Sequence, residues 1–145
     1  MSTFTVTNEL LIDADVEKVW DLTIDVERWP DTTPTITEVT LLDPGPVAVG
    51  TRARIVQPRQ RPRVWTVGRL EPNAAFEWST EVGPLTMTGG HRLTPTEHGT
   101  VNLLTVELTG RGATLAGRLL GRQLAKAIAT ENQGFKTAAE STLTP

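Results

Sequence analysis

The chain has 145 residues, a net charge of −3, and neither cysteine nor tyrosine. This length suits one domain, 1–145, that buries roughly 70% of its extended-chain surface. The lack of cysteine excludes disulfides, thiolate metal sites and a cysteine nucleophile, and the lack of tyrosine excludes a phenolic acid. The start of the chain has no basic segment leading into an apolar one, and no apolar run is long enough for a membrane span. A cytoplasmic protein is therefore expected.

Charge is distributed unevenly along the sequence. Residues 1–45 hold ten acidic residues against Lys18 and Arg28, whereas residues 51–70 hold six arginines and no acid. Such asymmetry can mark a surface that faces an anion. Equally, an arginine-rich hairpin can simply keep a sheet edge soluble. The sequence leaves both interpretations open.

The first elements are predicted to be a strand and two short helices. Residues 3–12 alternate loosely between apolar and polar and indicate the strand. Asp13 or Asp15 can cap the helix that follows. Four side chains in that helix fall at i, i+3, i+4 and i+7, namely Val16, Val19, Trp20 and Thr23. The second helical turn carries Trp29 and ends at Pro30.

The middle of the chain changes to a period of two. Six further strands are predicted, over residues 36–42, 52–57, 63–70, 76–80, 87–94 and 101–109. Proline- and glycine-containing turns separate most of them, so they follow one another in hairpin order. This order favours an antiparallel meander and an α+β fold class.

A long helix is predicted at the C-terminal end. Residues 122–141 span about 30 Å as a helix, and Leu124, Ile128, Phe135 and Ala139 share an apolar stripe. Residues 110–121 contain Gly112, Gly117 and Gly121, so their turns are expected to be loose or bent. The apolar stripe is expected to lie on the concave face of the sheet.

Strand and helix parity predicts which side chains point inward. His91 and Arg69 are the candidates for chemistry, because histidine exchanges protons near neutral pH and a fixed cation can stabilise an enolate. The candidate ligand-binding residues are Trp29, Trp65, Val67, Phe76, Trp78, Met87, Leu104, Val106, Ile128, Asn132 and Phe135. Each of these could instead be an ordinary core or surface residue, since a pocket wall and a core wall have the same pattern.

Other chemistries have little support in the sequence. Histidine occurs only at His91 and His98, so a histidine-rich metal site is not expected. No phosphate-binding loop, dinucleotide fingerprint or nucleophile elbow is present. We therefore expect no metal and no cofactor.

Three segments resemble one known superfamily. They are IDADVEKVW (12–20) with DVERWP (25–30), RVWTV (63–67) with EP (71–72) and FEW (76–78), and HRLTP (91–95) with GT (99–100). Their order is similar to that of the START-like or Bet v 1-like helix-grip superfamily, also called SRPBCC, and most similar to its polyketide cyclase/dehydrase branch. The resemblance implies about seven antiparallel strands in the order β-α-α-β6-α, curved around a long C-terminal helix and an apolar cavity.

The resemblance implies three alternative functions. An enzyme of this type would fold a polyketone chain in the cavity and assist its cyclisation or dehydration, although the missing tyrosine departs from the aromatase/cyclases. A carrier or sensor would need only the cavity and a hydrophobic ligand. An interaction protein, of the quinone-binding or ribosome-associated type, would use the arginines of residues 51–70. A nucleic-acid partner is not expected, the protein is expected to be a monomer or homodimer, and the sequence does not name the ligand.

Overall fold

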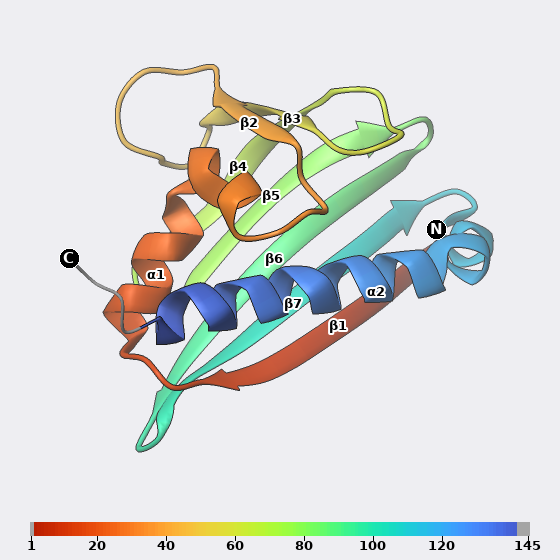
Figure 1. The fold of residues 1–145 in the computed structure, drawn as a ribbon. Helices are drawn as coiled ribbons and strands as arrows, with labels where there is room; N and C mark the ends of the chain where they lie inside the picture. The colour runs from red at the N-terminus through yellow and green to blue at the C-terminus, as the bar shows by residue number, and fades with distance from the viewer. Residues whose placement is uncertain (1, 142–145) are drawn as a thin grey trace.

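A seven-stranded antiparallel sheet and one long helix make up most of the structure (Figure 1). The computed structural model describes residues 2–141. The strands are β1 (Ser2–Ile12), β2 (Glu38–Leu41), β3 (Arg52–Val56), β4 (Arg63–Glu71), β5 (Ala75–Val82), β6 (Leu85–Thr96) and β7 (Gly99–Gly110). The helices are α1 (Val16–Ile24), the 3-10 helix η1 (Val26–Asp31) and α2 (Ala113–Glu140). The predicted α+β helix-grip fold is confirmed.

The sheet is a meander closed by its first strand. The strand order is β1-β7-β6-β5-β4-β3-β2, so β1 pairs with β7 and every other neighbour is a hairpin partner. Along β1 the side chains alternate between exposed and partly buried positions as far as the buried Ile12. This period of two is expected for a strand with one covered face. In Figure 1, α2 crosses the sheet as a second layer over β1 and β7.

Helices α1 and η1 cover one end of the sheet next to the end of α2. Val19, Trp20 and Thr23 form the buried face of α1, as their helical spacing predicts. Asp15 is the residue at the N-cap of α1, but its side chain makes no capping hydrogen bond. In η1, Trp29 is buried, and its indole Nε1 donates to the carbonyl oxygens of Leu22 and Thr23, at 3.2 Å each.

The long helix begins earlier than its glycines predict. Residues 113–121, expected to be loose or bent, are a regular part of α2. Gly117 and Gly121 face the ring of Phe4 on β1, and a Cβ atom at Gly117 would overlap that ring. The two glycines therefore let the helix approach β1 closely, and packing compensates for their low helix propensity.

A β-bulge in β4 changes the direction of one predicted site residue. Val67 lies opposite Trp78 and Arg69 lies opposite Glu77, so Gly68 is an extra residue between the two pairs. The insertion reverses the alternation of side chains along the strand. The prediction that Arg69 shares a face with Trp65 and Val67 is therefore wrong, because strand parity assumes an unbroken ladder.

Within residues 2–141, no helix has the length and apolar character needed to cross a membrane. The same residues contain no group of three or more histidine, aspartate or glutamate side chains that could hold a metal ion.

Candidate functional site

A pocket of about 570 Å³ lies between the inner face of the sheet and the middle of α2, from Leu120 to Glu131. Its inner walls come from β4, β5, β6 and β7, together with Trp29 of η1. At its outer end the pocket is lined by the β3–β4 loop and by Leu120 and Gln123 of α2, all in positions that solvent reaches. The pocket therefore has a mouth between this loop and the helix.

Eight of the predicted site residues line this pocket. They are Trp29, Trp65, Trp78, Met87, His91, Leu104, Val106 and Ile128. They come from η1, four strands and α2, so only the folded chain brings them together.

Four other predicted residues are buried behind the pocket. Val67 and Phe76 belong to the core beneath it, and Phe135 packs on Trp29 with ring centroids 5.7 Å apart. Asn132 is fully buried, and its Nδ2 donates to the side-chain oxygen of Asn8 at 2.9 Å. Its Oδ1 accepts a bond of 2.9 Å from Asn102. None of these four side chains is among those that line the pocket.

Arg69 lies outside the pocket as well. Its guanidinium forms an ion pair with Glu71 and a second one, of 3.6 Å, with Glu77 on the outer face of the sheet. These carboxylates hold the pKa of Arg69 above its ordinary value, with the Glu71 hydrogen bond as the largest cause. Arg69 therefore stays a surface cation with two partners and has no access to the pocket.

Aromatic rings form the inner end of the pocket. Trp29 lies at their centre, with ring centroids 5.1 Å from Trp78 and 5.2 Å from His91. Trp65 and Trp78 are 5.9 Å apart. Opposite these two rings stands Gly89, where an added Cβ would lie 3.6 Å from Trp78 and 3.8 Å from Trp65. A side chain at this position would therefore extend into the space beside both indoles, which glycine leaves free.

Two of these side chains have buried polar atoms without a partner. The indole Nε1 of Trp65 and the Nδ1 of His91 have no hydrogen-bond partner among the described residues. Buried polar atoms are usually paired, since an unpaired one costs about 1–3 kcal/mol. An occupant of the pocket with a carbonyl or hydroxyl group could satisfy the Trp65 donor.

His91 is neutral at physiological pH. Burial lowers its pKa to about 3, because the apolar surroundings disfavour the imidazolium. Its ring packs against Phe76 at 5.8 Å and Phe135 at 5.4 Å. His91 can therefore offer a neutral imidazole to a ligand, but it is a poor base near pH 7.

Glu131 of α2 is a pocket residue that is absent from the candidates predicted from the sequence. Its carboxylate accepts a hydrogen bond of 3.0 Å from the hydroxyl of Thr35. Burial raises its pKa to about 7, and the Thr35 bond opposes this shift only in part. A signal was present, because Glu131 falls seven residues after Leu124 and three after Ile128, within the apolar stripe of the helix. A carboxyl group at that place is the strongest candidate for proton exchange in the pocket.

The sequence matches one family model over residues 3–140, described as polyketide cyclase / dehydrase and lipid transport. The chain belongs to this family. The description of this family therefore names both enzymes and lipid transport. No curated protein matches the sequence.

Solved structures with low sequence identity share the fold. The di-domain ARO/CYC StfQ from the steffimycin biosynthetic pathway has a TM-score of 0.78 at 17% identity, over 95% of this chain. The chain spans only 51% of StfQ, which is about half its length. The Zhui aromatase/cyclase from Streptomyces sp. R1128 has a TM-score of 0.68 at 19% identity, over 97% of this chain and 99% of its own. Major latex-like protein 151 from Panax ginseng has a TM-score of 0.75 at 8% identity, over 96% and 99% of the two chains.

Proposed function

We propose that the protein binds an apolar, ring-containing or polyketone-like small molecule in the pocket under α2. The observation that carries this proposal is a pocket of about 570 Å³ with tryptophan walls, one of which, Trp65, has a buried Nε1 without a partner among the described residues. Ligand pockets typically measure about 300–1,000 Å³ and combine apolar walls with a few polar groups. The family description and the aromatase/cyclase folds support the same ligand class.

In this proposal the pocket residues have distinct roles. Trp29, Trp65 and Trp78 contact the faces of the ligand, and Met87, Leu104, Val106 and Ile128 complete the apolar walls. The indole of Trp65 donates to a ligand oxygen. His91 offers its neutral Nδ1 to the same molecule. Val67, Phe76, Asn132 and Phe135 support these walls from behind.

Binding of the ligand in this pocket can be tested by filling the pocket with a large side chain. Ala127 lines the pocket, whereas Ala125 on the same helix faces solvent. We expect Ala127→Trp to weaken binding of a hydroxyanthraquinone at least tenfold in isothermal titration calorimetry, and Ala125→Trp to leave it unchanged. Native mass spectrometry of the purified protein should also detect a co-purified apolar molecule. Equal binding by the two variants would rule out this pocket as the site.

The Trp65 hydrogen bond has its own test. Trp65→Phe keeps an aromatic wall and removes the donor. We expect it to reduce the preference for anthraquinone over anthracene, which lacks the carbonyl groups, by about five- to tenfold. An unchanged preference would show that Trp65 contributes only apolar surface.

A second candidate function is catalysis of cyclisation or dehydration, and Glu131 favours it over passive transport. A carboxyl group with a pKa of about 7 can accept a proton next to a ligand carbonyl and return it later. The C–H bond breaks, the proton passes to the Glu131 carboxylate, and the electron pair moves onto the carbonyl oxygen as an enolate. Trp65 is the donor available to that oxygen.

Catalysis can be separated from binding by isotope exchange. 1-Tetralone, an aromatic ketone that is not ionised at neutral pH, is incubated with the protein in D₂O, and exchange at its α-carbon is followed by NMR. We expect exchange above the buffer rate, rising with pH through about 7, and falling to the buffer rate in Glu131→Gln while binding persists. Exchange that survives in Glu131→Gln would assign the proton to another group, and no exchange at all would leave the carrier function.

A further inference from the structure

Basic residues without acidic neighbours in the sequence occur around the β3–β4 loop and from the end of β7 through the first two thirds of α2. Residues 57–64 and 110–130 contain no aspartate or glutamate, yet they hold half of the chain's 14 lysines and arginines. These seven cations are Arg59, Arg61, Arg63, Arg111, Arg118, Arg122 and Lys126. Among residues 2–141 none of them forms an ion pair with a carboxylate. We call this set the basic rim.

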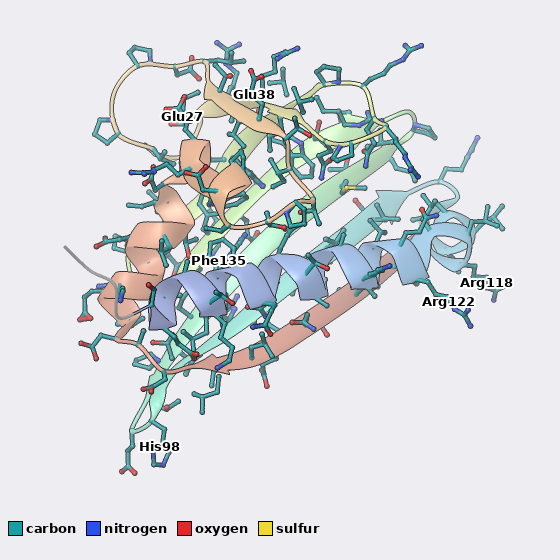
Figure 2. The ribbon with its side chains drawn as sticks, viewed as in Figure 1. Glu27, Glu38, His98, Arg118, Arg122 and Phe135 are labelled. Carbon is teal, nitrogen blue, oxygen red and sulfur yellow. The ribbon has the colours of Figure 1, made fainter. Side chains whose placement is uncertain are left out.

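Exposed leucines lie next to the members of the basic rim on α2. Leu115 is 63% exposed and Leu119 is 73% exposed, although both are on a helix that has a buried face elsewhere. With Arg118, Arg122 and Lys126 they fall at i, i+3, i+4, i+7 and i+11, which is one stripe of α2. Figure 2 shows Arg118 and Arg122 extending outward from the first turns of the helix. The stripe therefore presents apolar and cationic side chains together to the outside.

This stripe lies on the outer side of α2 and shares no residue with the set that lines the pocket. Leu120, which follows Leu119 in the sequence, is 42% exposed and lines the pocket. Across the mouth, Arg59 and Arg63 of the opposite lip line the same pocket. Two cations of the basic rim, Arg59 and Arg63, thus lie at the pocket, and the α2 stripe lies on the outside of the helix that covers it.

We propose that the basic rim docks the protein onto an anionic lipid surface. Exposed leucines enter the boundary between headgroups and acyl chains, while arginine and lysine attract anionic headgroups. A protein partner is less favoured, since protein interfaces concentrate aromatic anchors, and the exposed apolar residues of the α2 stripe are leucines. This docking is independent of whether the bound molecule is transformed.

The test uses vesicle sedimentation with two lipid compositions. Phosphatidylcholine vesicles are compared with phosphatidylcholine vesicles that contain about 30% phosphatidylglycerol, at low and physiological salt. We expect the wild-type protein to bind the anionic vesicles at least tenfold more strongly than the neutral ones, and more weakly as salt increases. Absence of this preference would overturn the proposal.

Matched variants distinguish docking from general electrostatics. Arg118→Glu with Arg122→Glu should abolish binding to the anionic vesicles, whereas the control pair Arg28→Glu with Arg92→Glu makes the same change of net charge outside the rim and should retain it. Leu115→Ser with Leu119→Ser should weaken binding several-fold. Equal loss in the control pair, or no loss in the leucine pair, would refute insertion at the rim. All of the side chains changed are exposed, and thermal melts confirm that each variant folds.

Soluble polyanions decide between the proposed surface and other anionic partners. Poly-L-glutamate and a single-stranded RNA oligomer are titrated against the wild type and the leucine pair. We expect weak binding to both, unaffected by the leucine substitutions. Binding to either polymer that is tighter than binding to the anionic vesicles and depends on Leu115 and Leu119 would assign the rim to a macromolecular partner and overturn the lipid proposal.

Discussion

The C-terminal part of α2 and its middle part differ in what lies between the helix and the sheet. Toward the C-terminal end of the helix, Asn132, Phe135 and Ala139 are buried against β1, β7 and α1, and buried polar groups there are largely paired. Toward the middle, Leu124, Ala127 and Glu131 face an open pocket, where the Nε1 of Trp65 and the Nδ1 of His91 lack partners among the described residues. The C-terminal part of α2 thus holds the helix on the sheet, and its middle part leaves space that a ligand can fill. The difference suggests that stability and function depend on separate residues of a single helix.

The largest expected effect belongs to the packed end. Asn132→Ala would leave polar atoms of Asn8 and Asn102 without their partner and create a cavity beneath the helix. We expect a loss of about 3–4 kcal/mol in the free energy of unfolding, measured by urea denaturation. Gln133→Ala, one position along on the exposed face, should change it by less than about 0.5 kcal/mol. A loss in Asn132→Ala as small as that expected for Gln133→Ala would mean that the asparagine network adds no stability.

The next effect is the pH dependence of folding stability that arises from two pocket residues, His91 and Glu131. His91 has a folded pKa of about 3 against an ordinary 6.5, so its contribution to stability falls as pH drops below 6.5. Glu131 has a folded pKa of about 7 against 4.5, so its contribution falls as pH rises from 4.5 to 7. Between pH 4.5 and 6.5 the folded and unfolded states then hold equal numbers of protons on this pair, and the two contributions cancel.

Single substitutions should reveal each half of this cancellation. Glu131→Gln should make stability rise with pH between 4.5 and 6.5, and His91→Gln should make it fall, each by up to about 1.4 kcal/mol per pH unit relative to the wild type. Denaturation at several pH values provides the measurement. His98→Gln is the control, because His98 lies at the tip of the β6–β7 turn (Figure 2) and should leave the profile unchanged. Parallel profiles for all four proteins would contradict the assigned protonation states.

A smaller effect is expected where α2 passes η1. A Cβ atom at Gly134 would overlap the backbone carbonyl of Thr32, which cannot rotate away as a side chain can. We expect Gly134→Ala to cost about 2 kcal/mol of unfolding free energy. Gly68→Ala, at the bulge, has open space around it and should be nearly neutral. A stable Gly134→Ala variant would show that the packed end can adjust more than its geometry suggests.

The smallest effect is expected at Arg69. Its partners Glu71 and Glu77 are on the surface, and exposed ion pairs contribute little to stability. We expect Arg69→Ala to retain the melting temperature, ligand affinity and any proton exchange of the wild type. A selective loss of exchange in this variant would restore the catalytic role predicted from the sequence and would contradict the outward orientation of the side chain.

The sequence by itself determined the order of the elements, the buried faces of most of them and the family. The elements and their buried faces depend on periods of 2 and 3.6 residues, which are local properties of the chain. The inward placement of Trp65, Trp78 and His91 follows from the same rule. The family depends on the resemblance of three segments, within residues 12–30, 63–78 and 91–100. The glycines of α2 led to a wrong prediction, because what they accommodate is the ring of Phe4, which is distant in the sequence.

Only the tertiary structure decided which inward residues face a space and which face one another. The bulge at Gly68 turned Arg69 outward, and the partners of Asn132 come from β1 and β7. Glu131 acquired its raised pKa from the burial that η1, the sheet and the helix create together. Register and packing depend on neighbours that are distant in sequence, so no local pattern records them.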